Sequence, residues 1–279
     1  TNIGYATSGK PWVLDLDIKG FFDNVDHGRL CEILQDRITD RKVLKLVWDF
    51  LKAGIMEDGN YRHSMLGTPQ GGIVSPLLAN VYLNELDQWV KKWTERTIDE
   101  GRKKWKRGKG NWHYVRYADD FLLLTNGGKG RAEKMMERVE DFVSEELNLT
   151  LSEKKSELIH AEDGFNFLGY DLKIKTETGG VQRTVPKEAK RDVIAKVRGA
   201  TNGNTDVSIR TKMKAVDAVL RGWANYYKYA TDAGSVFQDV QYKTWHEMTH
   251  WMAEKLKCSR SELIGRELDS TNPLTTNGV

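Results

Sequence analysis

The sequence predicts an α+β fold in which an antiparallel sheet with helices is followed by a helical subdomain. The chain has 279 residues, more than the ~100–200 residues of one typical domain, so two subdomains are expected. The expected elements run strand, helices, hairpin, helix and strands, which is close to the ferredoxin-like split βαβ arrangement. Apolar residues then recur every three or four positions from Ile209 to Tyr227, which predicts helix.

The first strand is expected over residues 12–18, where polar and apolar residues alternate. A period of two places Asp15 and Asp17 on one face of this strand. Two helices are expected next, and the clearer has apolar residues at helical spacing over residues 43–51. A Ser-Pro pair at residues 75–76 is typical of the start of another helix. The apolar face of that helix consists of Leu78, Tyr82, Leu86, Val90 and Trp93.

A β-hairpin is expected from two short apolar runs, residues 113–117 and 121–125, which enclose an Asp-Asp pair. An amphipathic helix over residues 135–143 follows, and further strands are expected over residues 157–160 and 165–174. These strands and the first one would form the antiparallel sheet.

Turn residues mark a boundary between two domains. Gly179 and Gly180 end the strand pattern, and Pro186 precedes the helical part of the chain. We therefore expect one domain over residues 1–185 and a second, helical domain over residues 186–279.

Composition excludes several classes of protein. A hydrophobic content of 39% with 10% aromatic residues can build a packed core, which excludes wholesale disorder. No apolar run reaches ~18 residues and no signal-peptide core is present, so neither a transmembrane helix nor secretion is indicated. The two cysteines lie far apart, which argues against a disulfide framework and fits a reducing compartment. A cytoplasmic (bacterial) or organellar location is expected.

The net charge of +3 is too small to indicate a partner, but the basic residues are clustered. One cluster lies within residues 102–109 and a second within residues 187–198. Such clusters suit phosphate backbones, whereas a solvated loop and a solvated helix face would show the same pattern.

Three carboxylates form the strongest candidate site. Asp17 ends an otherwise apolar strand, and Asp119 and Asp120 occupy the tip of a hairpin with apolar arms. If strand and hairpin are neighbours in one sheet, these charges converge and need cations to neutralise them. Carboxylate oxygens suit Mg²⁺, and two such ions can stabilise the attacking and leaving oxygens of phosphoryl transfer. An Asp pair in a turn is also common for structural reasons alone.

Three motifs in order along the chain carry a resemblance to a known family. Residues 117–120 (YADD) resemble the YxDD box of reverse transcriptases. Residues 17–27 (DIKGFFDNVDH) resemble their first catalytic motif, and residues 68–80 (TPQGGIVSPLLAN) resemble the motif between them. The sequences of these motifs resemble most closely those of the group II intron-encoded reverse transcriptase/maturase family, and the resemblance extends over most of the chain.

The resemblance implies a right-hand polymerase palm with partial fingers and a C-terminal helical thumb. It implies two Mg²⁺ ions, with Mn²⁺ as a substitute, held by Asp17, Asp119, Asp120 and the backbone carbonyl of Ile18. The implied reaction is RNA-directed addition of deoxynucleotides to a DNA primer 3′-hydroxyl. The implied partners are the RNA template, the primer, deoxynucleoside triphosphates and a group II intron RNA, with a maturase role in its splicing and mobility.

The resemblance also implies residues that bind the incoming nucleotide. Phe22 matches the position that excludes a 2′-hydroxyl, although an aromatic residue there also suits a core. Gln70 and Gly71 match the segment that approaches nucleotide and template, and an ordinary helix-entry turn is the alternative. Lys155 matches the lysine that neutralises the leaving pyrophosphate, while a solvated surface lysine is equally consistent with the sequence.

Primer and RNA contacts are implied in the same way. Phe167, Leu168 and Gly169 resemble the hairpin that grips the primer end, and a strand bulge is the alternative explanation of the glycine. Residues 220–227 resemble the maturase-specific X region, whose aromatic residues we expect mainly in the bundle core. Arg221 and Lys228, in and just after this segment, are the candidates for contact with RNA.

Two other functions are consistent with parts of the sequence. Residues 246–250 (HEMTH) fit the zinc-protease helix motif, with Glu262 or Glu267 as a guessed third ligand. A non-catalytic RNA-binding maturase module is the second alternative. Family members carry upstream fingers segments, which we expect to be missing here, and no endonuclease domain is recognised after the thumb.

Overall fold

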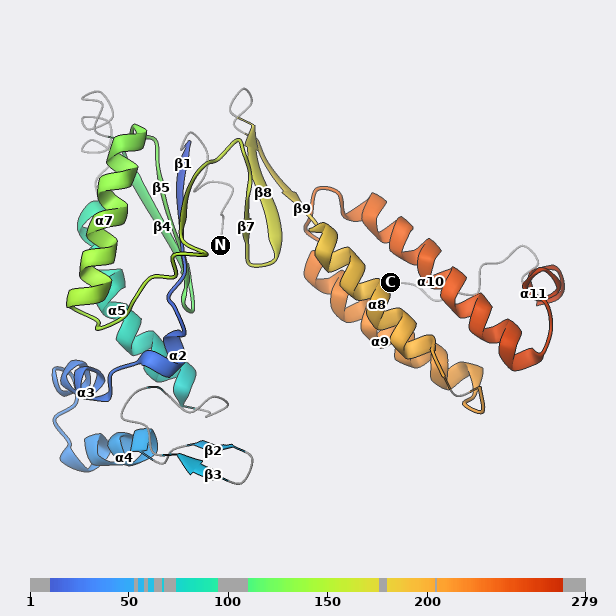
Figure 1. The fold of residues 1–279 in the computed structure, drawn as a ribbon, viewed down its shortest axis with the longest axis horizontal. Coiled ribbons are helices and arrows are strands. Elements are labelled where there is room, and N and C mark those ends of the chain that lie inside the picture. The colour runs from blue at the N-terminus through green and yellow to red at the C-terminus, as the bar shows by residue number, and fades with distance from the viewer. Residues whose placement is uncertain are drawn as a thin grey trace. The chain divides into compact units, whose positions relative to one another are not determined.

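The computed structural model describes residues 11–52, 55–57, 60–62, 67, 74–94, 110–175, 180–203 and 205–267 (Figure 1). The chain divides into two compact units. The first comprises residues 1–164 with 174–180, and the second comprises residues 165–173 with 181–279. The hairpin formed by residues 165–173 therefore belongs with the helical unit rather than with the sheet that precedes it.

The first unit is built on a four-stranded antiparallel sheet. Its strands are β1 (Trp12–Leu16), β4 (Trp112–Tyr117), β5 (Asp120–Thr125) and β6 (Glu157–His160), in the order β4-β5-β1-β6. With α5 and α7 as the connecting helices, this order is that of the ferredoxin-like split βαβ arrangement. The predicted fold class is therefore confirmed.

Two long helices cover one face of this sheet. Helices α5 (Ser75–Thr94) and α7 (Lys129–Glu145) lie on the same side of it (Figure 1). Leu14 and Leu16 of β1 are fully buried in the core beneath these helices. Because side chains alternate along a strand, Asp15 and Asp17 belong to the opposite face. This face carries the candidate site.

Shorter elements complete the first unit. Helices α2 (Phe21–Asn24), α3 (His27–Gln35) and α4 (Arg41–Lys52) follow β1, and β2 (Ile55–Glu57) pairs with β3 (Asn60–Arg62). The β2–β3 hairpin was not predicted from the sequence.

The second unit combines a small sheet with a helical bundle. The strands are β7 (Phe165–Phe167), β8 (Tyr170–Lys175) and β9 (Gly180–Thr184), and the helices are α8 (Lys187–Thr201), α9 (Ile209–Tyr227), α10 (Ala233–Leu256) and α11 (Arg260–Glu267). Val197, Val216, Met248 and Trp251 form one apolar cluster of this bundle. None of the described helices has the length and apolar character needed to cross a membrane.

Candidate active site

The end of β1 and the tip of the β4–β5 hairpin meet, as the sequence predicts. Leu16 pairs with Phe121 in the β1–β5 ladder, so Asp17 lies beside Asp120. Burial raises the pKa of Asp120, and the negative charges of Asp119 and Asp17 and a hydrogen bond with Asp17 raise it further. Both burial and the proximity of like charges favour protonation of Asp120.

Asp119 is the second residue of a two-residue turn. Tyr117 and Asp120 close the hairpin as a pair, which leaves Ala118 and Asp119 in the turn. Ala118 has a φ of 55°, in the left-handed region that an alanine rarely adopts. Among the described residues, no group of three or more His, Cys, Asp or Glu side chains is arranged to hold a metal ion. The three predicted carboxylates are therefore neighbours but do not form a closed metal cage.

Asp15 joins this acidic face, although the motif comparison leaves it out. Burial raises the pKa of Asp15 to about 7, together with the charges of Asp120, Glu157 and Asp17. Glu157 faces Asp15 across the β1–β6 ladder. The period of two in β1 was the signal that could have included Asp15.

Lys155 is the cation that reaches the acidic face. Its Nζ donates to Oδ1 of Asp17 over 3.2 Å, while the Asp17 side chain is only 15% exposed. The segment around Lys155 also hydrogen-bonds to the backbone of Asp17. The amide of Ser152 donates to the Asp17 carbonyl over 2.8 Å, and the amide of Asp17 donates to the Ser156 hydroxyl over 3.3 Å. Lys155, which the resemblance assigns to the leaving pyrophosphate, therefore lies next to Asp17.

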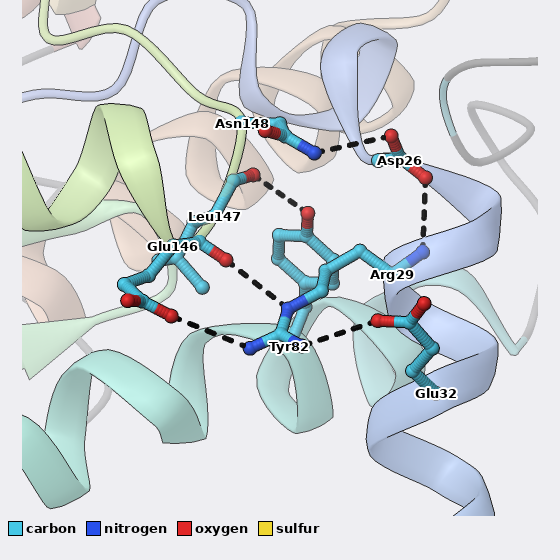
Figure 2. A network of polar contacts seen from close by, with 7 residues as sticks. All are labelled: Asp26, Arg29, Glu32, Tyr82, Glu146, Leu147 and Asn148. Carbon is cyan, nitrogen blue, oxygen red and sulfur yellow. Dashed lines mark hydrogen bonds and ion pairs between the residues drawn. The ribbon is translucent and has the colours of Figure 1, made fainter.

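A polar network anchors the loop that leads into this segment. Figure 2 shows its members, which come from α3, α5 and the loop after α7: Asp26, Arg29, Glu32, Tyr82, Glu146, Leu147 and Asn148. The buried hydroxyl of Tyr82 donates to the Leu147 carbonyl over 2.6 Å, and Arg29 Nε donates to the Glu146 carbonyl over 3.1 Å. The loop is therefore fixed to two helices.

The residues that follow the anchored loop, Thr150 and Leu151, pair with the backbone just after β1. The amide of Lys19 donates to the Thr150 carbonyl over 2.9 Å, and Ile18 pairs with Leu151 in an isolated bridge. These bonds hold the Lys155 segment alongside Asp17. Ile18 is buried, so the structure places its side chain in the core next to the proposed site.

Phe22 is half-buried beside the core residue Phe21, with their ring centroids 5.3 Å apart. Gln70 and Gly71 lie outside the described residues, but Gly67 just before them is described. Gly67 has a φ of 89°, and a Cβ atom there would lie 2.9 Å from the Asp23 carbonyl oxygen and 3.0 Å from that of Phe22. Only glycine fits this close approach. Gly67, which precedes the predicted nucleotide segment, therefore packs against the backbone of α2.

A buried histidine holds Gly67 in place. Nε2 of His27 hydrogen-bonds to the Gly67 carbonyl, and the Gly67 amide donates to the Val25 carbonyl over 2.8 Å. His27 is 1% exposed. His27, the last residue of the first catalytic motif (residues 17–27), therefore contacts Gly67, which directly precedes the second motif (residues 68–80).

The predicted primer hairpin is a tight turn rather than a strand bulge. Leu168 and Gly169 have φ values of 48° and 69° and connect β7, which ends at Phe167, to β8. The hydroxyl of Tyr226 donates to the Leu168 carbonyl over 2.6 Å, and that of Tyr227 donates to the Gly169 carbonyl over 3.2 Å. Helix α9 therefore holds both carbonyls of the turn.

Both candidate RNA contacts are exposed. Arg221 is 64% exposed and its Nε donates to Asp217 over 2.7 Å, while Lys228 Nζ lies 5.1 Å from the ring centroid of Tyr229. Exposed residues Arg210 and Lys214 precede them at helical spacing. The resulting basic stripe along α9 and its C-cap consists of Arg210, Lys214, Arg221 and Lys228, and Asp217 lies on the same face as the partner of Arg221.

The two basic clusters differ in what the structure shows. Residues 102–109 lie outside the described part of the chain. In α8, three of the basic residues form ion pairs with neighbouring carboxylates. These pairs are Lys190 with Asp239, Arg191 with Glu188 and Arg198 with Glu247. The second cluster is therefore largely neutralised within the protein.

The protease alternative is not supported. The Nδ1 atom of His246 hydrogen-bonds to Arg260, and His250 pairs with Glu254 at 3.4 Å. Glu247 accepts a hydrogen bond from Arg198. The residues of the HEMTH segment thus have partners within the protein, and the described part of the chain contains no zinc-binding cluster.

Comparison with known proteins gives the same family as the motifs. The model of reverse transcriptase (RNA-dependent DNA polymerase) matches residues 3–172, and the group II intron, maturase-specific domain matches residues 190–266. Protein YkfC of Escherichia coli is 34% identical in an alignment 203 positions long that covers 66% of this chain and 53% of that protein. The group II intron-encoded protein LtrA of Lactococcus lactis is 33% identical in an alignment 222 positions long that covers 63% of this chain and 37% of LtrA.

A solved structure of telomerase from Candida albicans, in complex with a fragment of telomeric RNA, is 13% identical. The alignment covers 97% of this chain and 50% of the telomerase chain, with a TM-score of 0.46. The chain spans between about a third and a half of the length of the two curated relatives. The two family models together cover most of the described residues. The chain therefore belongs to the group II intron reverse transcriptase/maturase family.

Proposed function

We propose that this chain carries out RNA-directed DNA synthesis, adding deoxynucleotides to a primer 3′-hydroxyl. The observation that carries the proposal is the juxtaposition of Asp17 at the end of β1 with the Asp119–Asp120 turn. Carboxylates from strands far apart in the sequence meet there, within a fold whose family synthesises DNA on RNA.

The donors present fit Mg²⁺. They are carboxylate oxygens. Burial and then the charges of Asp119 and Asp17 raise the pKa of Asp120, and a bound cation would relieve the repulsion between these charges. Asp17, Asp119 and Asp120, with the Ile18 carbonyl, are the groups that would hold two ions. When bound, the metal would stabilise the charge on the attacking and leaving oxygens. The hairpin turn sets where the Asp119 carboxylate lies.

Lys155 is assigned to the leaving group. Its ammonium group lies against Asp17 and is 69% exposed, so it can reach a negatively charged ligand on the same face. Its positive charge would neutralise the departing pyrophosphate, and its proton is available for transfer. The anchored loop before it restricts where the side chain can go.

The nucleotide site is assigned to Phe22, Gln70 and Gly71. Phe22 sits at the start of α2, and its carbonyl oxygen lies 3.0 Å from where a Cβ atom at Gly67 would be. Its ring would occupy the space that a ribose 2′-oxygen needs. The selection of deoxynucleotides is therefore proposed to be steric.

The second unit is proposed to hold nucleic acid. The β7–β8 turn (Phe167 to Gly169) would contact the primer end, and the basic stripe on α9 would contact phosphates of the template–primer duplex or the intron RNA. Binding to the intron RNA would support its splicing and mobility. We place this activity in a bacterial cytoplasm or an organelle.

The test is primer extension on an RNA template with deoxynucleotides and Mg²⁺, comparing the unmodified chain with Asp119→Asn. The variant should lose extension and keep RNA affinity, because the carboxylate positions metal and does not contact RNA. An inactive unmodified chain that still binds RNA would favour the non-catalytic maturase module. Equal extension by chain and variant would remove Asp119 from the site.

A further inference from the structure

A half-buried ion pair lies next to the turn that carries Asp119. Arg116 of β4 and Asp87 of α5 form a two-bond fork, with Nε to Oδ1 at 2.7 Å and Nη2 to Oδ2 at 2.5 Å. The side chains are 11% and 25% exposed. Tyr114, two residues before Arg116 on the same strand face, donates its hydroxyl to Asp87 over 2.8 Å. Asp87 therefore holds Arg116 in one orientation.

The remaining guanidinium nitrogen points to the turn. Nη1 of Arg116 donates to the Ala118 carbonyl over 2.9 Å and to Oδ1 of Asn80 over 3.1 Å. Asn80 ends the predicted nucleotide motif (residues 68–80) on α5. One side chain thus joins α5, β4 and the hairpin turn. A lysine has no planar fork and could not make these contacts together.

The turn needs such support because of its backbone. Two-residue hairpin turns require a positive φ at their first position, where glycine, asparagine or aspartate is preferred. Here that position is Ala118, with a φ of 55°. The methyl group makes this conformation costly unless the surrounding structure enforces it.

We propose that Arg116, held by Asp87, is the positioning residue that keeps the Ala118–Asp119 turn in its left-handed conformation and thereby sets the direction of the Asp119 carboxylate. This rests on the proposed function only in assigning Asp119 to the reaction. The local burial is consistent with a permanently charged pair: burial alone would disfavour the charge, but the hydrogen bonds and the charge of Asp87 outweigh it and raise the pKa of Arg116.

The test compares Arg116→Lys with and without Ala118→Gly. Arg116→Lys should lower kcat for single-nucleotide addition by about 10- to 100-fold, because small misplacements of reacting groups have effects of that size. The Kd for template–primer should not change. Ala118→Gly should restore most of the lost kcat in the Arg116→Lys background, because glycine adopts a positive φ without strain. Arg138→Lys, an exposed arginine on α7, is the matched control and should leave kcat unchanged.

Hydrogen exchange of the backbone amides of residues 117–121 gives a second readout that needs no activity. Exchange should be faster in Arg116→Lys and in Asp87→Asn than in the unmodified chain, and unchanged in Arg138→Lys. The positioning role is overturned if exchange in Arg116→Lys is no faster than in the unmodified chain. It is also overturned if the variant carrying both Arg116→Lys and Ala118→Gly folds but regains no kcat. If the unmodified chain extends no primer, the proposed function fails, and the exchange measurement still decides the role of Arg116.

Discussion

The ammonium group of Lys155 lies 3.2 Å from a carboxylate oxygen of Asp17, although 138 positions separate the two residues in the chain. The contact depends on the anchored loop after α7, which Tyr82 and Arg29 fix to two helices. An exposed ion pair of this kind contributes little to folding stability, typically about 0–1 kcal/mol. Its value to the protein is therefore expected in function.

Replacing Lys155 should impair the chemical step. Lys155→Ala should lower kcat for deoxynucleotide addition by about 100-fold, because a positioned proton donor contributes about that much. Lys154→Ala is the matched control, since Lys154 is exposed in the same turn. Single-turnover primer extension measures both. Equal rates for the two variants would make Lys155 an ordinary surface lysine.

Removing the ring of Phe22 should relax sugar selection. Phe22→Ala should raise the kcat/KM for ribonucleotides relative to deoxynucleotides by about 10- to 100-fold, as expected when a hydrophobic steric contact is lost. Phe50→Ala on α4 is the control, because Phe50 is 50% exposed and lies outside the proposed site. Competitive incorporation of the two nucleotide types gives the ratio. An unchanged ratio would assign discrimination to another residue.

Gly67 should not tolerate a side chain. Gly67→Ala should lower the free energy of unfolding by at least about 1–2 kcal/mol, which is the cost of a left-handed alanine before any clash with Asp23 is counted. Gly199→Ala in α8 should instead raise it by about 0.5–1 kcal/mol, because no atom lies within 4 Å of the added Cβ and helix propensity improves. Urea unfolding of both variants provides the comparison. A neutral Gly67→Ala would mean that its backbone can relax.

The α9 stripe should contribute to RNA affinity through charge. Lys228→Gln should reduce the slope of log K against log salt by about 0.7–0.9, which corresponds to one lost phosphate contact. Lys45→Gln on α4, whose partner is Asp49, should leave the slope unchanged. Fluorescence anisotropy with labelled RNA between low and moderate salt measures the slope. Identical slopes for Lys228→Gln and the unmodified chain would contradict a phosphate contact.

Folding stability should depend on pH through Asp239. Hydrogen bonds from Lys190 and Lys243 lower the pKa of Asp239 in the folded protein. The stabilisation is therefore present above the ordinary aspartate pKa of about 3.9 and is lost as pH falls through the lower folded value. Asp239→Asn should cost at most about 1 kcal/mol at pH 7, and the difference from the unmodified chain should shrink toward pH 3. Asp192→Asn, an exposed carboxylate on α8, is the control for urea unfolding at both pH values. A difference that stays constant with pH would exclude this ion pair as its cause.

The sequence by itself determined the sheet, its helices and the family, because these follow from local patterns. Alternation along β1 placed Asp15 and Asp17 on one face, and the YADD and TPQGG motifs identified the family before any contact was known. The resemblance implied a hairpin at residues 167–169, and the structure shows that its turn depends on positive φ values at Leu168 and Gly169. The assignment of that hairpin to the helical unit likewise depended on hydroxyl contacts from α9.

Only the tertiary structure decided which charges meet. Lys155 rather than Lys154 contacts Asp17, Glu157 lies opposite Asp15, and Arg116 reaches both Asp87 and the Ala118 carbonyl. The physical reason is that side-chain hydrogen bonds and electrostatic interactions act over a few ångströms in space. Residues far apart in the sequence acquire such partners only when packing fixes the backbone, so local periodicity cannot report them.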